Sequence, residues 1–229
     1  MTRALLLTVA LTGLRSSELR GLRWSDVDLK ACELHVRQRA DKYRAIGAPK
    51  SASSRRTVPT DHDVLLPALK AWRLACPKGE LGLVFPGSDG GIAHHRGLLL
   101  KLQAAVKAAS VVDKSGEPKY TGLHSFRHFF ASWCINARSL GGRELPPKAV
   151  QALMGHASIT ETLDTYGHLF PSKRRQGRAV QFSAGFVRLR ILATHMRHRG
   201  GFFNIINGSA RPVSPRYKIH AVGRGGRRP

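Results

Sequence analysis

The pattern of apolar and polar positions predicts a mostly helical protein. A nearly continuous apolar stretch over residues 5–11 predicts a buried helix close to the start of the chain. Ser16 and Ser17 can cap a second helix that continues through Leu22. Apolar residues at helical spacing then predict four further helices, over residues 63–76, 96–110, 124–138 and 148–154.

The pattern changes twice along the chain. Residues 33–37 alternate between polar and apolar, and residues 56–59 form a second short candidate strand, with a loop-like stretch rich in Lys, Gly, Pro and Ser between them. Gly155 is placed to end the helix before it, and Ser158 with Glu161 has the form of a capping box for a short helix that ends near Tyr166. The predicted fold class is α+β, mainly α-helical with a small antiparallel β-sheet on one side.

Charge changes this picture by indicating a polyanionic partner. The chain holds 38 Lys and Arg against 14 Asp and Glu, a formal net charge of +24, which argues against an ordinary metabolic enzyme. A hydrophobic fraction of 42% excludes a wholly disordered basic tail. All 14 acidic residues precede residue 171. We therefore expect a globular domain over residues 1–170 and a flexible, Gly/Arg-rich basic extension over residues 171–229, in which residues 186–196 could form a short helix.

Cysteine spacing and hydropathy indicate an intracellular protein. Cys32, Cys76 and Cys134 lie far apart without a C-x-x-C pair, which argues against a disulfide framework or a zinc ribbon and fits a reducing cytoplasm. No apolar run approaches the roughly 20 residues that a membrane span requires. The basic start and apolar stretch of residues 1–11 resemble the first part of a signal peptide. No small-x-small cleavage site follows them, and we interpret the stretch as a core helix.

Three stretches carry candidate chemistry. Arg15 lies in a turn between two helices, His124 and Arg127 are one turn apart at a helix start, and His156 precedes Tyr166 across the short capped helix. Arginine does not ligate metals, and these residues bring no carboxylate or thiolate with them, so they form a poor metal site. They suit a phosphate, because Arg offers planar pairs of donors and His exchanges a proton near neutral pH.

The chain resembles the catalytic domain of the tyrosine recombinases, the phage integrase family. Five segments carry the resemblance in the family's order and spacing, across roughly residues 4–170: TGLRSSELRGLRWSDVDL, PKSASSRRTVPT, LVFPGSDGG, HSFRHFFASW and LMGHASITETLDTYGHLF. The resemblance implies an integrase-type catalytic fold that cleaves and rejoins DNA strands through a 3′-phosphotyrosyl intermediate, in site-specific recombination or integration of a mobile element. It also implies double-stranded DNA as partner, a homotetramer on that DNA, no cofactor, no metal, and a location in the cytoplasm at the bacterial nucleoid.

The resemblance also assigns residues. By motif, the catalytic group comprises Arg15, Lys50, His124, Arg127, His156 and Tyr166. Tyr166 matches the nucleophile, and Lys50 matches the lysine of the β-hairpin, the candidate general acid for the departing 5′ oxygen, although Lys42 lies in the same hairpin region. Arg15 and Arg127 would clamp the non-bridging oxygens, His156 would donate a further hydrogen bond, and His124 is the candidate acid–base group.

A free tyrosine has a pKa near 10, so only about one molecule in a thousand is phenolate at pH 7, a penalty of roughly 4 kcal/mol. An arginine-rich site lowers that penalty and neutralises the pentacoordinate transition state.

Each of these residues also has a purely structural interpretation. Tyr166 could be half-buried packing, His156 a helix cap, and Lys50 a solvated loop lysine. Glu18 is expected to support Arg15 or its helix. Four other histidines are interpreted as structural or surface residues, namely His94, His95, His128 and His168. The aromatic residues of the fourth predicted motif are expected in the core, namely Phe126, Phe129, Phe130 and Trp133. Arg55 and Arg56 are expected to contact phosphates, or to form a solvated edge.

The chain departs from the family at both ends. Family members normally finish with a helix or strand that docks on a neighbouring subunit, whereas residues 171–229 are acid-free and Gly/Arg-rich. Family members usually carry an N-terminal helical domain that closes around DNA, whereas Met1 falls in the helix just before the first catalytic arginine. We therefore expect a truncated or frameshifted reading frame, with a catalytic domain that is incomplete at its N-terminus. Two alternatives stay open at this point: a catalytically silent DNA-binding remnant, and a DNA topoisomerase of the related tyrosine class.

Overall fold

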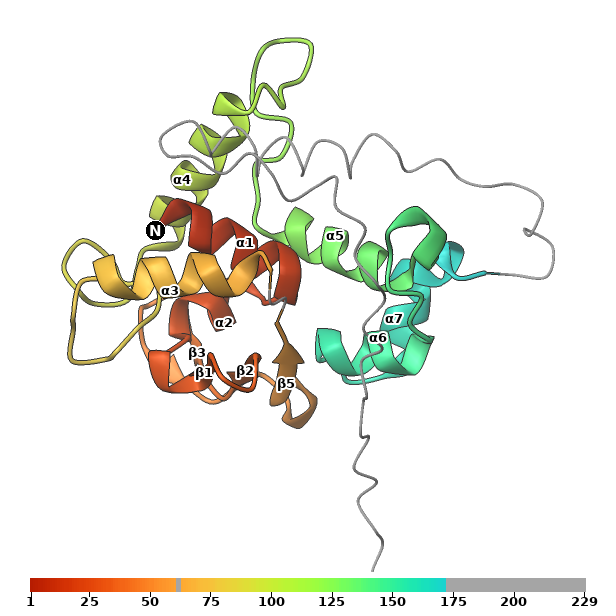
Figure 1. Cartoon of the computed structure of the whole chain (residues 1–229), viewed down its shortest axis with the longest axis horizontal. Helices are drawn as coiled ribbons and strands as arrows, with labels where there is room; N and C mark the ends of the chain where they lie inside the picture. The colour runs from red at the N-terminus through yellow and green to blue at the C-terminus, as the bar shows by residue number, and fades with distance from the viewer. Residues whose placement is uncertain (61–62, 172–229) are drawn as a thin grey trace, which may run out of the picture. The chain divides into compact units, whose positions relative to one another are not determined.

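The computed structural model describes residues 1–60 and 63–171. This part is mainly helical with a small antiparallel sheet, as the sequence predicts (Figure 1). The expected helix over residues 186–196, and the basic extension beyond Pro171, lie outside the described residues.

The α-helices are α1 (Thr2–Thr12), α2 (Ser16–Gly21), α3 (Leu65–Ala75), α4 (His95–Ala108), α5 (His124–Ile135), α6 (Pro147–Met154) and α7 (Ile159–Tyr166). The strands are β1 (Val27–Asp28), β2 (Glu33–Val36), β3 (Arg39–Ala40), β4 (Ile46–Gly47) and β5 (Arg56–Pro59). Short 3-10 turns lie at η1 (Trp24–Asp26), η2 (Ala52–Ser54), η3 (Arg138–Leu140) and η4 (Gly167–Leu169).

Helix α1 lies at the centre of the larger core and packs against α3, α4 and α5 (Figure 1). Most of its residues are buried, including Leu5 and Val9, because apolar side chains point to several faces of the helix. The helix ends at Gly13, whose φ of 62° is the left-handed conformation that glycine adopts without strain. A Cβ at this position would lie 2.4 Å from Cδ1 of Phe130, so the close approach of α5 also requires glycine here.

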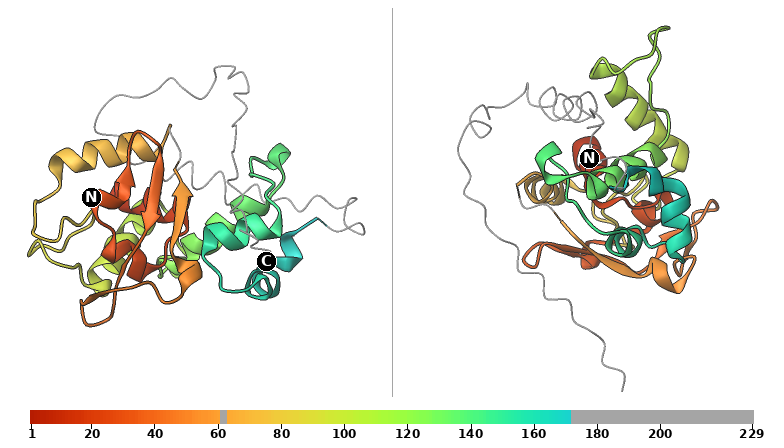
Figure 2. Two further views of the ribbon diagram at one scale, coloured as in Figure 1. Left: turned by 90° about the horizontal axis from the view of Figure 1, so that it is seen from below. Right: turned by 90° about the vertical axis from the view of Figure 1, so that its right-hand side faces the viewer.

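The sheet has the strand order β1-β2-β5, and both pairings are antiparallel (Figure 2, left). Both predicted strands are confirmed as β2 and β5, paired in the register Leu34 opposite Val58. Leu34 and Val36 point into the larger core, while Glu33 and His35 on the other face are partly exposed, which is the alternation that a half-buried strand produces. The sequence pattern does not predict strand β1.

The stretch between β2 and β5 contains more structure than the expected loop. Strands β3 and β4 form an antiparallel hairpin, and the 3-10 turn η2 follows it. The Asp41 carboxylate closes the hairpin turn by accepting hydrogen bonds from the backbone N–H groups of Tyr43 and Ala45. The stretch that the sequence pattern indicates as loop-like therefore contains a two-stranded hairpin, which lies against α2.

Helices α5, α6 and α7 form a second, smaller core with Val58 of β5. Its buried residues are Val58, Phe130, Ala131, Cys134, Ile135, Val150, Met154 and Tyr166. Phe126 and Phe130 are buried and Phe129 and Trp133 partly buried, which confirms these aromatic residues as core. Through Val58, this core lies against the same sheet whose other strands cover the larger core.

Several helix ends differ from the sequence prediction. Helix α5 ends at Ile135 rather than at residue 138, because the chain folds back so that the backbone N–H groups of Glu144 and Leu145 donate to carbonyl oxygens near the helix end. Ser16 and Ser17 are not caps: Arg15 occupies the N-cap of α2, and its backbone N–H donates to the Glu18 carboxylate. The caps predicted at Gly155 and Ser158 are confirmed, but the Glu161 carboxylate accepts from the backbone N–H of Ala157 rather than of Ser158, so the predicted capping box is only half formed. Gly155 has a φ of 64° after α6, and Ser158 Oγ accepts from the backbone N–H of Glu161 at 3.3 Å.

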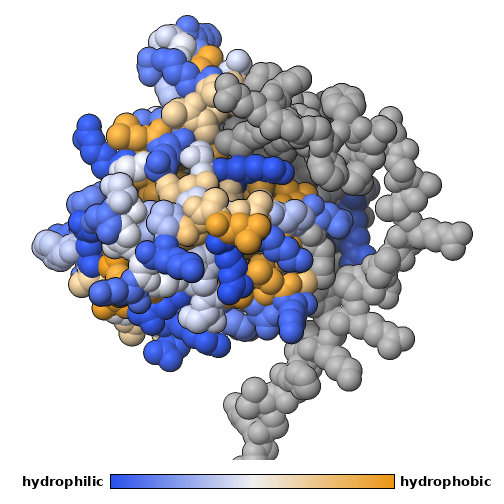
Figure 3. All heavy atoms as spheres, turned by 60° about the vertical axis from the view of Figure 1, so that its left-hand side comes forward, coloured by the Kyte–Doolittle hydropathy of each residue, from blue (hydrophilic) through white to orange (hydrophobic). Residues whose placement is uncertain are grey.

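Among the described residues, no helix is long and apolar enough to cross a membrane. On the face that Figure 3 presents, hydrophilic side chains are widespread, with smaller groups of apolar side chains between them.

Candidate active site

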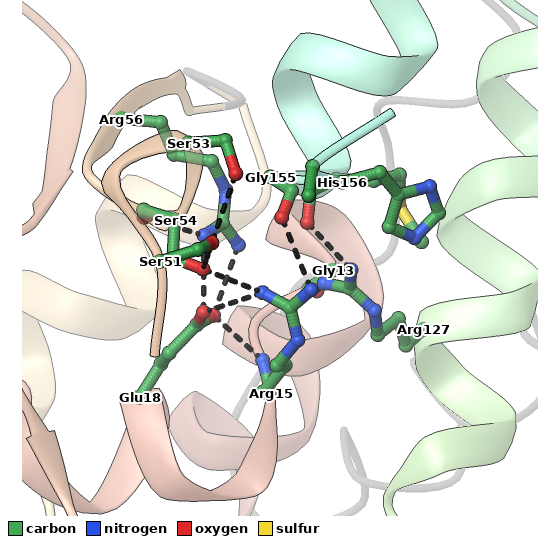
Figure 4. Close-up of polar contacts among 12 residues, drawn as sticks. Gly13, Arg15, Glu18, Ser51, Ser53, Ser54, Arg56, Arg127, Gly155 and His156 are labelled. Carbon is green, nitrogen blue, oxygen red and sulfur yellow. Dashed lines mark hydrogen bonds and ion pairs between the residues drawn. The ribbon is translucent and has the colours of Figure 1, made fainter. Parts of the chain in front are cut away.

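The predicted site residues come from separate segments that the fold brings together. Arg15 is the N-cap of α2, three residues after the last residue of α1. His124 and Arg127 lie in the first turn of α5, His156 lies just after α6, and Tyr166 is the last residue of α7. Figure 4 shows the guanidinium groups of Arg15 and Arg127 close to the end of α6, at the junction of the two cores.

Glu18 organises the arginines of the site. Its carboxylate is almost fully buried, and it forms ion pairs at 2.9 Å with both Arg15 and Arg56 (Figure 4). Burial alone would raise the pKa of Glu18, but the hydrogen bonds and charges of Arg56 and Arg15 outweigh burial, and the pKa lies below its ordinary value. Glu18 is therefore ionised at neutral pH, and the prediction that it supports Arg15 is confirmed.

Arg56 has a different position from the one expected. Its side chain is buried, with Nη1 and Nη2 donating to Glu18 and Nε donating to the carbonyl oxygen of Leu153 at 2.7 Å. These contacts attach β5 to α2 and to the end of α6. The alternative of a solvated edge is therefore wrong for Arg56, and its expected phosphate contact stays a prediction, whereas Arg55 is exposed.

Arg127 is the most deeply buried cation of the predicted set. Its two terminal nitrogens donate to the carbonyl oxygens of Gly13 and Met154, at the ends of α1 and α6. Burial, followed by the charges of Arg15 and Arg56, lowers the pKa of Arg127 to about 10, so the side chain is still a cation at pH 7. Arg15 is more accessible, with 30% of its side chain exposed, and it donates to Ser54 Oγ and to the carbonyl oxygen of Gly155.

Tyr166 is packed between two histidines. Its ring is 4% exposed and stacks on that of His156, with centroids 6.4 Å apart and planes inclined by 6°. Burial raises the pKa of Tyr166 although the charge of Arg127 opposes it, so the phenol is protonated at neutral pH. The same burial, together with Arg127, lowers the pKa of His156 to about 4, so that imidazole is neutral. His156 Nδ1 lies 2.8 Å from Thr162 Oγ1, which fixes the ring.

His128 is the residue that sequence reasoning missed. Its Nδ1 lies 2.8 Å from the Tyr166 hydroxyl oxygen, and its ring meets the ring of His124 edge-on at 4.5 Å. His124 is exposed overall, but its imidazole is partly shielded from solvent by the protein. This partial burial, followed by the charges of His128, Arg127 and Arg15, lowers the pKa of His124. His128 lies one turn after His124 on α5 and directly follows Arg127, a spacing that could have raised it above a surface histidine.

The two candidate lysines lie in different places. Lys50 is exposed, in the segment between β4 and η2, and makes no hydrogen bond or ion pair within the described residues. Lys42 lines a cavity of about 590 Å³ together with Arg15, Arg20, Arg39 and His124. The cavity wall is therefore strongly basic, with Asp41 as its acidic member. Lys50 is not brought to this cavity.

The charge balance of the site suits a phosphate. Three buried or partly buried guanidinium groups face one buried carboxylate, which leaves a net positive charge beside the Tyr166 phenol. Phosphate oxygens match such donors, and a buried positive site stabilises charge that develops on a pentacoordinate phosphorus. Within residues 1–60 and 63–171, no three His, Cys, Asp or Glu side chains are grouped to hold a metal ion.

Comparisons of the sequence with known proteins identify the family of the chain. The model of the phage integrase family matches residues 1–173. The chain is 30% identical over 196 residues to a tyrosine recombinase XerC-like protein of Caldanaerobacter subterraneus subsp. tengcongensis, a match that covers 75% of this chain and 46% of the relative. It is 32% identical over 167 residues to the tyrosine recombinase XerC of Xylella fastidiosa (strain 9a5c), covering 73% of this chain and 48% of the relative.

A solved structure gives the same result for the fold. The Tn1549 transposon integrase, residues 82–397 in complex with circular intermediate DNA, is similar with a TM-score of 0.56 and 25% identity. The match covers 82% of this chain and 59% of that one. This chain spans about half the length of the curated relatives it matches.

Proposed function

The chain belongs to the phage integrase family, and on this basis we propose that it cleaves and rejoins DNA strands as a site-specific tyrosine recombinase that integrates a mobile element. The observation that carries the proposal is the position of Tyr166. Its hydroxyl group lies at the end of α7, against His128 and beside the charge of Arg127. A phenol in contact with imidazoles and near a guanidinium charge is equipped to attack a phosphodiester.

The proposed reaction is a transesterification. The Tyr166 oxygen attacks the scissile phosphorus, a 3′-phosphotyrosyl bond forms, and the 5′ oxygen leaves with a proton. The reverse reaction, with a 5′ hydroxyl as nucleophile, rejoins the strand. Because the phosphotyrosyl bond keeps the energy of the phosphodiester, rejoining requires no nucleotide cofactor.

We assign roles to the six predicted residues within this reaction. Arg15 and Arg127 hold the non-bridging oxygens, and neutral His156 donates a hydrogen bond without adding charge. His124 is the exposed acid–base group at the rim of the site. Lys50 is the general acid for the 5′ oxygen, and its exposed position allows it to reach DNA outside the protein surface. Lys42 is the alternative, because it lies on the wall of the basic cavity with Arg15.

Double-stranded DNA is the proposed partner. The net charge of +24 favours binding to phosphates, and the similar Tn1549 integrase structure is itself a complex with DNA. We propose that four copies of the chain assemble on that DNA, in the cytoplasm at the bacterial nucleoid. Residues 1–170 would form the catalytic domain, and the basic residues 171–229 would add contacts to the DNA backbone.

A covalent-trapping assay tests the proposal. The substrates are nicked duplexes with randomised positions around the nick, so that cleavage releases a short strand that diffuses away and leaves the adduct trapped. We expect a DNA-linked protein band on a denaturing gel with the wild-type chain and none with Tyr166→Phe. Tyr43→Phe is the matched control, because Tyr43 is 77% exposed on the hairpin.

Three results would point elsewhere. DNA binding without any adduct would favour a silent DNA-binding remnant. Relaxation of supercoiled plasmid without preference for any site would favour a topoisomerase. An adduct that persists in Tyr166→Phe would assign the nucleophile to another residue, which peptide mapping of the adduct would identify.

A further inference from the structure

The Tyr166 hydroxyl has one hydrogen-bond partner within the described residues, and that partner is His128. The oxygen lies 2.8 Å from His128 Nδ1, and the two rings are inclined by 61° with centroids 5.6 Å apart. This geometry places a ring nitrogen within direct proton-transfer distance of the nucleophile. The contact joins α5 to the end of α7, so it also fixes the direction of the phenol.

Among the residues that the structure describes, the other basic groups around Tyr166 are not placed to accept its proton. His156 stacks parallel to the Tyr166 ring, and its two ring nitrogens face Thr162 and Glu161. Arg127 is a cation without an acceptor. His124 lies behind His128, in edge contact with that ring, and makes no hydrogen bond to the phenol in this structure.

We propose that His128, and not His124, is the catalytic base that accepts the Tyr166 proton, an inference that rests on the proposed strand-cleavage function and replaces the acid–base role given to His124 above. As the Tyr166 oxygen forms its bond to phosphorus, the phenol proton moves to His128 Nδ1 and the P–O5′ bond breaks. The departing 5′ oxygen takes a proton from the general acid, Lys50 or its alternative Lys42. On rejoining, the 5′ hydroxyl attacks phosphorus and gives its proton back to the lysine, the bond between phosphorus and the Tyr166 oxygen breaks, and His128 returns its proton to the phenolate. The enzyme therefore ends in its starting state.

The proposal requires one tautomer of His128. Neutral imidazole carries one donor and one acceptor nitrogen, so Nδ1 can accept from the phenol only when the hydrogen is on Nε2. His128 is exposed, and within the described residues its Nε2 makes no hydrogen bond that would require the opposite tautomer. With the opposite tautomer, Nδ1 would donate to the tyrosine oxygen and would be unable to act as base.

The first experiment determines this tautomer without DNA. The full chain is labelled with ¹⁵N at histidine, and two-bond ¹H–¹⁵N spectra distinguish a protonated from an unprotonated ring nitrogen. We expect His128 to be the Nε2–H tautomer and its Nδ1 resonance to move in Tyr166→Phe. A His128 ring protonated at Nδ1 would overturn the proposal.

The second experiment measures single-turnover cleavage of a duplex selected by covalent trapping. His128→Asn places an amide oxygen near the position of Nδ1, where it can accept the phenol hydrogen bond but cannot take the proton. We expect this variant and His128→Phe to cleave roughly 10²–10⁴-fold more slowly than the wild type. His35→Asn is the matched control, because the His35 ring also pairs with a hydroxyl group, at 2.9 Å from Thr57, but lies on β2.

A sulfur leaving group separates nucleophile activation from leaving-group protonation. A substrate with sulfur in place of the bridging 5′ oxygen needs little help from a general acid, because thiols are far more acidic than alcohols. We expect the His128→Asn defect to persist on this substrate, since the phenol must still lose its proton.

The outcomes are distinguishable. Cleavage by His128→Asn at the wild-type rate would overturn the proposal, whether or not His128→Phe is slow. It would show that His128 only positions Tyr166, because asparagine can accept the hydrogen bond but cannot take the proton. Recovery of His128→Asn on the sulfur substrate would also overturn it, by moving His128 to the leaving-group side. Absence of any covalent product with the wild-type chain would instead overturn the proposed function, and this inference with it.

Discussion

Among single residues, Glu18 has the largest influence on the geometry of the site. It is a buried carboxylate in contact with two arginines, and Arg127 adds a third positive charge nearby. Without Glu18, the guanidinium groups of Arg15 and Arg56 would face each other without compensation. The carboxylate therefore holds a cationic site together while leaving it with an excess of positive charge for a phosphate.

We expect Glu18→Gln to lower the free energy of unfolding at pH 7 by about 3 kcal/mol, because it removes one partner of a buried ion pair and leaves the other charged. Urea denaturation followed by circular dichroism measures this change. The control is Glu117→Gln, which breaks the exposed pair with Lys107 and should cost no more than about 0.5 kcal/mol. Equal effects of the two substitutions would contradict the role given to Glu18.

His156 gives the stability a defined pH dependence. Its pKa is about 4 in the folded chain against 6.5 as the ordinary value, so between these pH values the unfolded chain binds more protons. We therefore expect the stabilisation to be complete above pH 6.5 and to be lost progressively as the pH falls toward 4. Urea titrations at several pH values should show this slope in the wild type and a smaller one in His156→Asn. An unchanged slope in the variant would assign the effect to other groups.

The roles of Lys50 and Lys42 can be distinguished with the substrate that carries sulfur in place of the bridging 5′ oxygen. If Lys50 protonates the 5′ oxygen, Lys50→Ala should slow cleavage of the ordinary substrate by roughly 10²–10⁴-fold and should recover on the sulfur substrate. Lys42→Ala should weaken DNA binding with little effect on the cleavage step. The reverse pattern would transfer the general-acid role to Lys42, on the wall of the basic cavity.

The sequence predicts site residues where a local motif contains them. Arg15, Arg127 and Tyr166 are recognisable from their motifs, and the structure brings these three into one neighbourhood. The partners of His128 and Arg56 are not recognisable in this way. His128 contacts Tyr166 and Arg56 contacts Glu18, and each pair lies 38 positions apart in the sequence. These contacts therefore depend on how helices and strands pack, and no local pattern predicts them.

At the scale of elements, helix ends build the site. Helices α1 and α6 both end at glycines in the left-handed conformation, Gly13 and Gly155. The carbonyl oxygens of Gly13 and Met154 converge on Arg127, while the carbonyl oxygen of Gly155 accepts from Arg15. Two helix C-termini thereby hold two cations, an arrangement that the helix dipole favours.

Gly155→Ala should destabilise the protein by roughly 1–2 kcal/mol. The substitution strains a residue with a φ of 64°, and the new Cβ would lie 2.8 Å from Nη1 of Arg56, so that side chain must move. Gly97→Ala in α4 is the control, because its Cβ meets nothing within 4 Å, and alanine there should stabilise the helix by up to about 1 kcal/mol. Thermal unfolding measures both changes. A neutral or stabilising Gly155→Ala would contradict the prediction.

The sequence predicts long elements and misses the shortest ones. Each of the helices α3 to α7 has enough residues to show a period, and each lies within a few residues of its predicted bounds. Strands β1, β3 and β4 have two residues each, and two residues carry no period. The hairpin of β3 and β4 depends instead on the turn at Asp41 and on contact with α2, and the latter is a tertiary contact.

At the scale of the whole molecule, the proposed function divides the work: charge should determine how strongly the chain binds DNA, and the site should determine which reaction the bound DNA undergoes. Of the 38 basic residues, 14 lie within residues 171–229, where no acid offsets them. Phosphate contacts supply affinity without sequence specificity, and each contact releases counterions. The logarithm of the DNA-binding constant therefore falls with the logarithm of the salt concentration, and each contact makes this negative slope steeper by about 0.9. A segment with this composition should therefore add to the affinity and to its salt dependence, but not to the choice of site.

We therefore expect a chain that ends at Pro171 to bind a random duplex more weakly than the full chain at low salt, and with a smaller salt slope. The two binding curves should converge as salt rises, because the additional contacts are electrostatic. Fluorescence anisotropy at four or five salt concentrations measures both slopes, and covalent trapping of both chains on one selected duplex at equal occupancy provides the control. Equal slopes would show that the basic segment does not touch DNA. A changed cleavage rate at equal occupancy would show that this segment acts on the site itself, and affinity and catalysis would then not be separable between the two parts of the chain.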